Sequence, residues 1–151
     1  MIIRKATDKD SRAVFNLLIE LRRSGYQEMG EQAKEIKAGE KAPELYTELI
    51  KRSDIHILLA EENGQVIGLS VIYEIIKVLD GQPRLLIEEF VVLPDFRGKG
   101  VGSKMLDYIE NIARGGNIQI VKVTTGTKLK ANDFYKKHGY VLFENAYRKK
   151  L

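Results

Sequence analysis

Two adjacent carboxylates and a glycine-rich basic turn lie close together in the middle of this chain. Glu88 and Glu89 interrupt an apolar stretch that extends from Leu85 to Leu93. Pro94 cannot donate to a sheet ladder, so it ends the strand that this stretch predicts. The turn Arg97-Gly98-Lys99-Gly100-Val101-Gly102 follows. Because a carboxylate can accept a proton and such a turn can bind a phosphate, the region predicts acid–base chemistry beside an anion site.

An amphipathic helix is predicted directly after this turn. Its apolar residues recur at helical spacing: Val101, Met105, Leu106, Ile109, Ile112 and Ala113. The N–H groups of the turn and of the first helical residues can converge on a phosphate, and the helix dipole favours negative charge there. A strand, a glycine turn and a helix N-terminus therefore predict a site for a phosphorylated ligand.

Three interpretations of the turn compete. A dinucleotide fingerprint needs a third glycine, where this chain has Ser103, and a Walker A loop needs a G-K-S/T ending that is missing here. A glycine-rich turn without a ligand is the alternative to all three. The third interpretation is a phosphate loop of the form Arg97-x-x-Gly100-x-Gly102, placed after a strand that ends in V-x-x-P.

This last pattern resembles the acyl-CoA pyrophosphate loop of the GNAT-type N-acetyltransferase superfamily, Q/R-x-x-G-x-G/A. A second stretch resembles the family pattern N-x-x-A-x-x-F-Y-x-x-x-G-F/Y. The matching residues there are Ala131, Phe134, Tyr135, Gly139 and Tyr140. The family's asparagine falls at Lys128, and Asn132 is the predicted substitute.

The resemblance implies an enzyme that transfers an acetyl group from acetyl-CoA to an amine; the alternative is a CoA-binding regulatory module that has lost catalysis. A lysine-like amine is neutral in only about one part in a thousand at pH 7, so a positioned base helps. Neighbouring side chains of a regular strand point to opposite faces, so only one of Glu88 and Glu89 can face the substrate. The resemblance implies Glu88 as the base, and Glu89 is the alternative. A β-bulge would reverse that choice. Tyr135 is the implied general acid.

The resemblance also implies the cofactor contacts. The pantetheine pairs along Phe90, Val91 and Val92, and an N–H near Val92 stabilises the oxyanion. The pyrophosphate lies on the amides of the turn, with charge from Arg97 and Lys99. The full predicted set is Phe90, Val91, Val92, Arg97, Gly98, Lys99, Gly100, Val101, Gly102, Ser103, Asn132 and Tyr135.

The acceptor is expected to meet the irregular polar stretch from Tyr26 to Lys41, since loops on a rigid scaffold tend to carry specificity. The predicted acceptor contacts are Glu28, Glu31 and Glu35. These carboxylates favour a small cationic amine such as a polyamine. A protein or peptide amine is the alternative acceptor.

Composition narrows the remaining classes. The chain has 151 residues, is 44% hydrophobic and 30% charged, and carries a formal net charge of +4. It has no cysteine, and its histidines lack metal-ligand companions, so no metal site is predicted. Without a basic stripe with interleaved aromatics, nucleic-acid binding is disfavoured. A cytoplasmic protein without a membrane span is expected, and a homodimer is compatible with the prediction.

The elements that position these residues predict one domain, residues 1–151, of α+β class. Helices are expected after Thr7 as far as Ser24-Gly25, from Pro43 to Arg52, after Gly100, and from Lys128 to Lys137. Strands are expected over 1–5, 55–60, 65–78, 83–93, 118–124, 140–143 and 146–148. This order resembles the GNAT fold: a central mixed, mostly antiparallel twisted sheet of about seven strands, flanked by about four helices.

Overall fold

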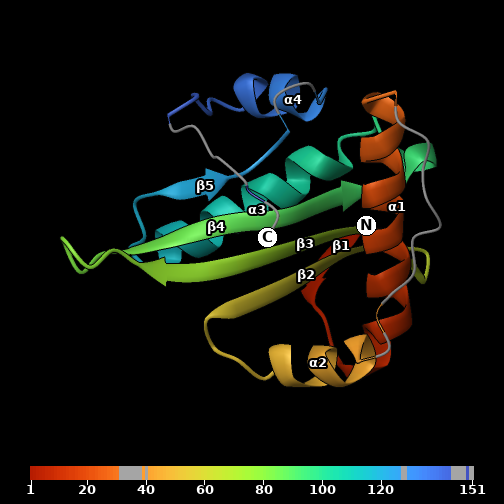
Figure 1. Ribbon diagram of the computed structural model, residues 1–151, viewed down its shortest axis with the longest axis horizontal. Helices are drawn as coiled ribbons and strands as arrows, with labels where there is room; N and C mark the ends of the chain where they lie inside the picture. Colours follow the sequence, from red (N-terminus) through yellow and green to blue (C-terminus); the bar gives the residue numbers. More distant parts are fainter. Residues whose placement is uncertain (31–38, 40, 127–128, 144–148, 150–151) are drawn as a thin grey trace.

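A computed structural model of the protein describes residues 1–30, 39, 41–126, 129–143 and 149, which form a central sheet between helices (Figure 1). The strands are β1 (Ile2–Lys5), β2 (Ile55–Glu62), β3 (Gln65–Ile76), β4 (Pro83–Val92) and β5 (Val121–Val123). The helices are α1 (Ser11–Glu28), α2 (Ala42–Leu49), α3 (Val101–Gly115) and α4 (Ala131–Lys137), with short 3-10 turns at Asp8–Asp10 and Pro94–Phe96. The four predicted helices are confirmed.

The sheet is mixed, and its order is β1-β2-β3-β4-β5. The first four strands are antiparallel neighbours, and β5 pairs with β4 in parallel. Asn63 and Gly64, with φ of 52° and 79°, make the predicted tight turn between β2 and β3. The prediction of a mixed, mostly antiparallel sheet is therefore confirmed.

The predicted strand number of about seven is wrong, because the described residues form five strands. The strand expected over 118–124 shortens to Val121–Val123, and residues 140–143 form no strand. Val141, Leu142 and Phe143 are 80%, 86% and 79% exposed, so their apolar side chains pack on no sheet face. An apolar composition favours a strand only where a paired edge is present. The last expected strand, 146–148, lies outside the described residues.

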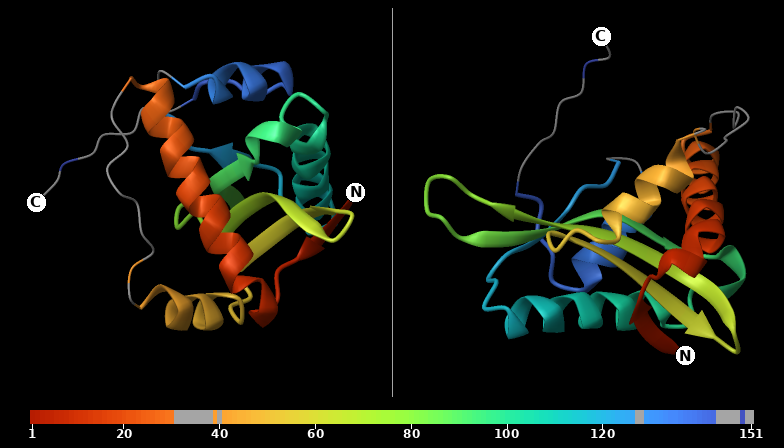
Figure 2. Two further views of the ribbon diagram at one scale, coloured as in Figure 1. Left: turned by 90° about the vertical axis from the view of Figure 1, so that its right-hand side faces the viewer. Right: turned by 90° about the horizontal axis from the view of Figure 1, so that it is seen from below.

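Helices cover both faces of the sheet (Figure 2). We call the side covered by α1 and α2 the α1 face; its core includes Val14, Leu17, Leu59, Leu69 and Val91. The other side, covered by α3 and α4, is the α3 face, and its core includes Leu58, Ile72, Leu85, Ile87 and Leu106. Neighbouring residues of a strand enter opposite cores, as the two-residue period of a β-strand requires.

Helix α1 is longer than predicted. Ser24-Gly25 was expected to end it, but the helix continues to Glu28, and Gly30, with φ of 71°, follows its end. A glycine inside a helix costs only about 1 kcal/mol, which tertiary packing can offset. The extra turn brings Glu28 beside the start of α4. Helix α2 also ends earlier than predicted, at Leu49, and α4 begins later, at Ala131. None of the described helices is long and apolar enough to cross a membrane.

The start of α1 is fastened to the sheet by the buried carboxylate of Asp10. The Thr7 N–H donates to Asp10 at 2.7 Å, as the predicted capping box requires, and two Arg4 nitrogens donate to it at 2.8 and 2.9 Å. Arg4 also donates to Glu61 of β2 at 2.7 Å. These hydrogen bonds, above all those from Arg4, hold the pKa of Asp10 well below its usual range. Asp10 therefore links β1, β2 and α1.

We predict that Asp10→Asn lowers the free energy of unfolding by about 2 kcal/mol at neutral pH, because it removes the more buried of the two carboxylates that pair with Arg4 and leaves only Glu61. Chemical denaturation measures this loss. Because the pKa of Asp10 is depressed in the folded state, its stabilisation is present above the unfolded value of about 3.9 and disappears as the pH falls through the folded value.

The matched control is Asp54→Asn, which breaks an exposed ion pair with Arg52 and should change stability little. Equal losses in the two variants would contradict a special role for Asp10.

Candidate active site

The alternation of side chains along β4 is interrupted at Glu88. Val71 of β3 faces Glu89, whereas the next residue, Ile72, faces Ile87, so Glu88 is an extra residue in the strand. Such a bulge reverses the face to which the following residues point. Ile87 enters the core of the α3 face, and Val91 enters that of the α1 face. Glu89, two residues before Val91, therefore lies on the α1 face.

The two carboxylates consequently differ in environment. Glu88 is exposed, and Glu89 is half-buried. Burial raises the pKa of Glu89 above its ordinary value; the positive charge of Arg22 on α1 partly offsets this, and the neighbouring charge of Glu88 adds to it. The favoured candidate, Glu88, thus has a solvent-exposed side chain, while the alternative, Glu89, has the environment of a proton acceptor tuned toward neutral pH.

Beyond the bulge, β4 has an edge without a strand partner. Within the described residues, β5 pairs with β4 only over Leu85–Ile87 (Figure 1). We call residues 88–92 the unpaired edge. The Leu93 N–H donates to Ile67 of β3 at 2.9 Å, so the polar backbone groups of Val92 and Phe90 point the other way, out of this edge. This is the part of β4 predicted to pair with the pantetheine.

The glycine turn has the backbone that a phosphate cradle needs. Gly98 and Gly100 have φ of 72° and 82°, which side-chain-bearing residues rarely adopt, and space around both is open for a ligand to approach. Helix α3 begins at Val101, with no acidic residue in its first turn. Gly102 serves another purpose: a Cβ there would lie 3.3 Å from the ring of Phe134, so it lets α3 pack against α4.

Arg97, predicted to supply charge to the cofactor, is engaged elsewhere. Its Nε–H donates to the Val92 carbonyl at 2.8 Å, and a terminal nitrogen donates to Ser24 of α1 at 2.9 Å. The same nitrogen is 3.6 Å from Glu20, which accepts from Ser24 at 2.7 Å. Arg97 therefore fastens the end of β4 to α1 and occupies the Val92 carbonyl. Among the described residues, no acceptor is seen for the Val92 N–H, which is left for a ligand.

Two further residues of the turn region have defined partners. The Lys99 ammonium lies over the ring of Phe96, 5.5 Å from its centroid, a cation–π contact. The Ser103 hydroxyl, in the first turn of α3, lies 2.9 Å from Nε2 of His138. The other His138 ring nitrogen, Nδ1, lies 2.8 Å from the Phe134 carbonyl. His138, at the end of α4, therefore connects α4 to α3.

Tyr135 is buried at the α3 face, next to the unpaired edge. Its ring contacts those of Phe90, Phe134 and Tyr140, with centroids 6.2, 5.2 and 5.6 Å away. Burial, with a smaller effect of Tyr140, raises the pKa of Tyr135 well above the usual range. The phenol is therefore protonated at neutral pH, the state that a general acid requires.

The remaining candidates hold the chain itself together or lie outside the described residues. The Asn132 amide donates to the carbonyls of Gly126 and Leu129, both at 2.8 Å. Glu28 accepts from the Lys130 N–H at 3.0 Å, which ties the end of α1 to the start of α4. Glu31 and Glu35 lie outside the described residues.

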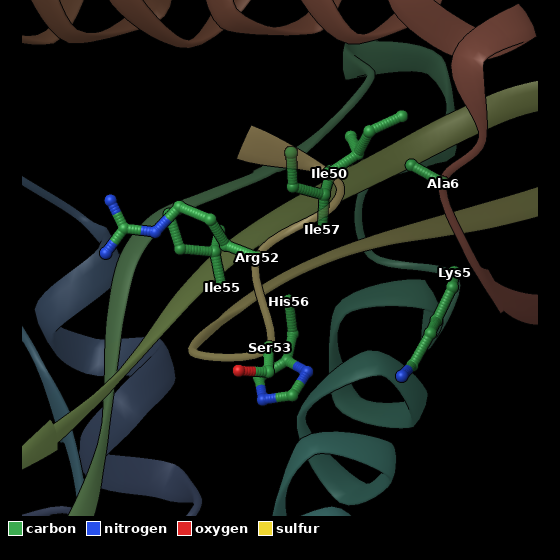
Figure 3. A pocket seen from close by; sticks show the side chains of 8 residues that line it. All are labelled: Lys5, Ala6, Ile50, Arg52, Ser53, Ile55, His56 and Ile57. Atoms are coloured by element: carbon green, nitrogen blue, oxygen red, sulfur yellow. The ribbon is translucent and has the colours of Figure 1, made fainter. Parts of the chain in front are cut away.

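A surface pocket lies apart from all of these residues. Ala6, Ile50, Ile55 and Ile57 line it together with the polar side chains of Lys5, Arg52, Ser53 and His56 (Figure 3). Arg52 is paired with Asp54 at 2.6 Å, and none of the predicted site residues reaches the pocket. Across the described part of the chain, no cluster of three His, Asp or Glu could hold a metal. The candidate site is therefore the unpaired edge with its flanking residues.

Sequence reasoning missed Arg22, the Arg97 contacts and the His138–Ser103 pair. Each depends on residues distant in the sequence, such as the 73 positions between Arg97 and Ser24. Their only local signals were weak: arginine and serine on a predicted helix, and a histidine near a helix end.

Comparison with known proteins identifies the family to which this chain belongs. A profile of the acetyltransferase (GNAT) family matches residues 16–140. The chain belongs to this family. Aminoalkylphosphonate N-acetyltransferase of Salmonella typhimurium is 30% identical over 91% of this chain and 83% of its own length. Histidine N-acetyltransferase of Oreochromis niloticus is 29% identical over 62% of this chain and 27% of its own length.

The fold of this acetyltransferase also matches solved structures. A variant of the BH1408 protein of Bacillus halodurans superposes with a TM-score of 0.83 over 100% of both chains, at 19% identity. At that identity the likeness shows the fold alone. The family match confirms the resemblance seen in the two sequence motifs. Enzymes of the GNAT family use acetyl-CoA and an amine acceptor.

We predict that Gly100→Val weakens acetyl-CoA binding, whereas Arg97→Gln lowers stability and leaves that binding nearly unchanged. A β-branched residue at a φ of 82° strains the turn, so Gly100→Val should weaken acetyl-CoA binding by more than about tenfold. Arg97→Gln should keep the Kd for acetyl-CoA within about threefold, because its guanidinium binds Val92 and Ser24, while lowering the free energy of unfolding by about 1 kcal/mol. Calorimetric titration and denaturation measure both. A tenfold loss of affinity in Arg97→Gln would instead make Arg97 a phosphate ligand.

Proposed function

We propose that this acetyltransferase moves the acetyl group of acetyl-CoA to the primary amine of a small molecule that also carries an anionic group. The observation that carries the proposal is the bulge at Glu88, which puts the half-buried Glu89 of the unpaired edge on the α1 face. The acyl donor and the amine can then approach from opposite faces of the sheet and meet at this edge.

The residues of the α3 face fit acetyl-CoA. The N–H groups from Gly98 to Ser103 and the start of α3 suit its pyrophosphate. The outward backbone groups of Phe90 can pair with the amides of its pantetheine, as an added strand would, while the Val92 N–H faces the acetyl oxygen. When bound, acetyl-CoA supplies the activated acetyl group. Of the predicted set, Arg97 and Asn132 support this site by bracing the chain.

One proton transfer then takes place on each face of the sheet, with Glu89 acting on the α1 face and Tyr135 on the α3 face. Glu89 accepts a proton from the acceptor's ammonium group, because only the neutral amine attacks a thioester. The Val92 N–H stabilises the oxygen that becomes negative during attack. Tyr135 donates its proton to the departing sulfur. Glu88, exposed and adjacent, remains the alternative base.

Two observations favour an acceptor with an anionic group. Arg22 is close enough to Glu89 to act on its charge, so the α1 face offers a cation beside the proposed base. The relatives reported above are named for aminoalkylphosphonate and for histidine, which both join an amine to an acidic group. The polyamine prediction has less support, because Glu28 is bound to Lys130 and the other two glutamates lie outside the described residues.

We predict that Glu89→Gln lowers kcat by about 100-fold or more, while Glu88→Gln changes it little. In the wild type, kcat/KM should fall on the acid side with an inflection above the ordinary glutamate pKa of about 4.3, because burial raises the pKa of Glu89. Glu89→Gln should lose this inflection. It should also be at least as stable as the wild type at neutral pH, since a raised pKa means that folding disfavours the charged form. A larger loss of kcat in Glu88→Gln than in Glu89→Gln would instead make Glu88 the general base.

The acceptor is tested by a panel of aminoalkylphosphonates, histidine, polyamines and peptides, with detection of the released CoA thiol. We expect turnover of amines that carry an acidic group, and a rise in their KM of about tenfold in Arg22→Gln. Arg12→Gln, an exposed arginine at the other end of α1, is the matched control and should leave KM unchanged. Turnover of polyamines or peptides alone would overturn the acceptor class, and acetyl-CoA binding without thiol release on any amine would indicate a non-catalytic module.

A further inference from the structure

The contact between His138 and Ser103 has a consequence for cofactor binding. His138 lies at the end of α4, and Ser103 lies in the first turn of α3, immediately after the glycine turn. Both side chains are half-buried. The pair therefore borders the surface at which the proposed function puts the pyrophosphate, and the following inference rests on that proposal.

The hydrogen-bond partners fix which ring nitrogen of His138 carries the proton. Only an N–H can face the Phe134 carbonyl at 2.8 Å, so whenever the ring is neutral it is Nδ1 that carries the proton. Nε2 then has a lone pair and accepts the Ser103 O–H at 2.9 Å. The ring is further held by Phe134, whose centroid is 4.4 Å away, and turning it over would break both hydrogen bonds.

This arrangement conflicts with an anion beside Ser103. A hydroxyl has one proton, and here the proton points at His138, so the oxygen presents only lone pairs to a phosphate. To donate to a phosphate oxygen, Ser103 must withdraw its proton from Nε2. Nε2 would then face the lone pairs of the serine oxygen, and it can hydrogen-bond to them only if it carries a proton of its own.

We propose that pyrophosphate binding is coupled to proton uptake by His138. A proton from solvent forms the Nε2–H bond, Nε2–H donates to the Ser103 oxygen, and the Ser103 O–H turns to donate to the phosphate. The imidazolium then adds a positive charge one hydroxyl away from the cofactor. His138 is a positioning residue here, because it acts on the phosphate through Ser103.

Charged side chains of both signs lie near the pair in sequence. Lys104 on α3 and Lys136 and Lys137 on α4 are exposed, as are Asp107 on α3 and Asp133 on α4. Across the described residues, no ion pair joins His138 to a carboxylate, and the proposal starts from the neutral ring.

The test is calorimetric titration of the full chain with dephospho-CoA at pH 7.5, in buffers of different ionisation enthalpy. This ligand keeps the pyrophosphate and lacks the 3′-phosphate, whose own titration near pH 6 would confuse the proton count. The slope of the observed binding enthalpy against the ionisation enthalpy of the buffer gives the number of protons taken up per ligand bound. We expect uptake approaching about one proton, and a Kd that rises with pH by at most about tenfold per unit.

Three variants isolate the pair. His138→Gln keeps a donor for Ser103 without a titratable ring, so it should bind dephospho-CoA and take up no proton. Ser103→Ala should also lose the uptake and bind more weakly. His56→Gln, at the other histidine of the chain, should retain it.

The outcomes separate this inference from the proposed function. Binding by the wild type with no buffer dependence, or uptake that persists in His138→Gln, overturns the coupling and leaves the cofactor site intact. Absence of any binding of CoA or dephospho-CoA to the wild type overturns the cofactor site itself.

Discussion

The candidate site depends on one additional residue in β4. Backbone hydrogen bonds fix the alternation of a strand, so a single extra residue at Glu88 redirects everything that follows it. Without the bulge, Glu89 would enter the apolar core of the α3 face and Phe90 would enter that of the α1 face. With it, Glu89 faces Arg22 on α1, and Phe90 meets Phe134 and Tyr135 on the other side. A proposed base and a proposed acid are thereby separated by the sheet and share its unpaired edge.

Helix α1 connects the two halves of this arrangement. Its start is fixed by Asp10 to β1 and β2, its middle by Arg97 to the end of β4, and its last residue, Glu28, to α4. Two residues that resembled ligand contacts in the sequence, Arg97 and Glu28, are therefore structural braces in the described chain. A helix held at three points keeps the backbone that carries Arg22 in place relative to β4, and positioning of an amine benefits from such a fixed frame.

Much of this could be predicted from local sequence. The glycine turn, the tight turn at Asn63-Gly64 and the apolar periods of α1 and α3 each carry their signal within a few residues, and they were sufficient for the family and the helices. The sheet edge and the roles of Arg97, Glu28 and His138 were not predictable in this way, because each depends on a partner brought close only by the fold. Whether Glu88 or Glu89 faces α1 depends on a bulge, and two adjacent glutamates contain no sign of one.

The central claim is that acetyl-CoA binds along the unpaired edge of β4 and against the glycine turn. Backbone hydrogen exchange with and without acetyl-CoA tests it most directly, because a paired amide exchanges more slowly than a free one. The account predicts that the Phe90 and Val92 amides and those of residues 98–103 become protected, while the pocket around Lys5 and His56 is unchanged. Protection at that pocket, or none at Phe90 and Val92, would contradict it.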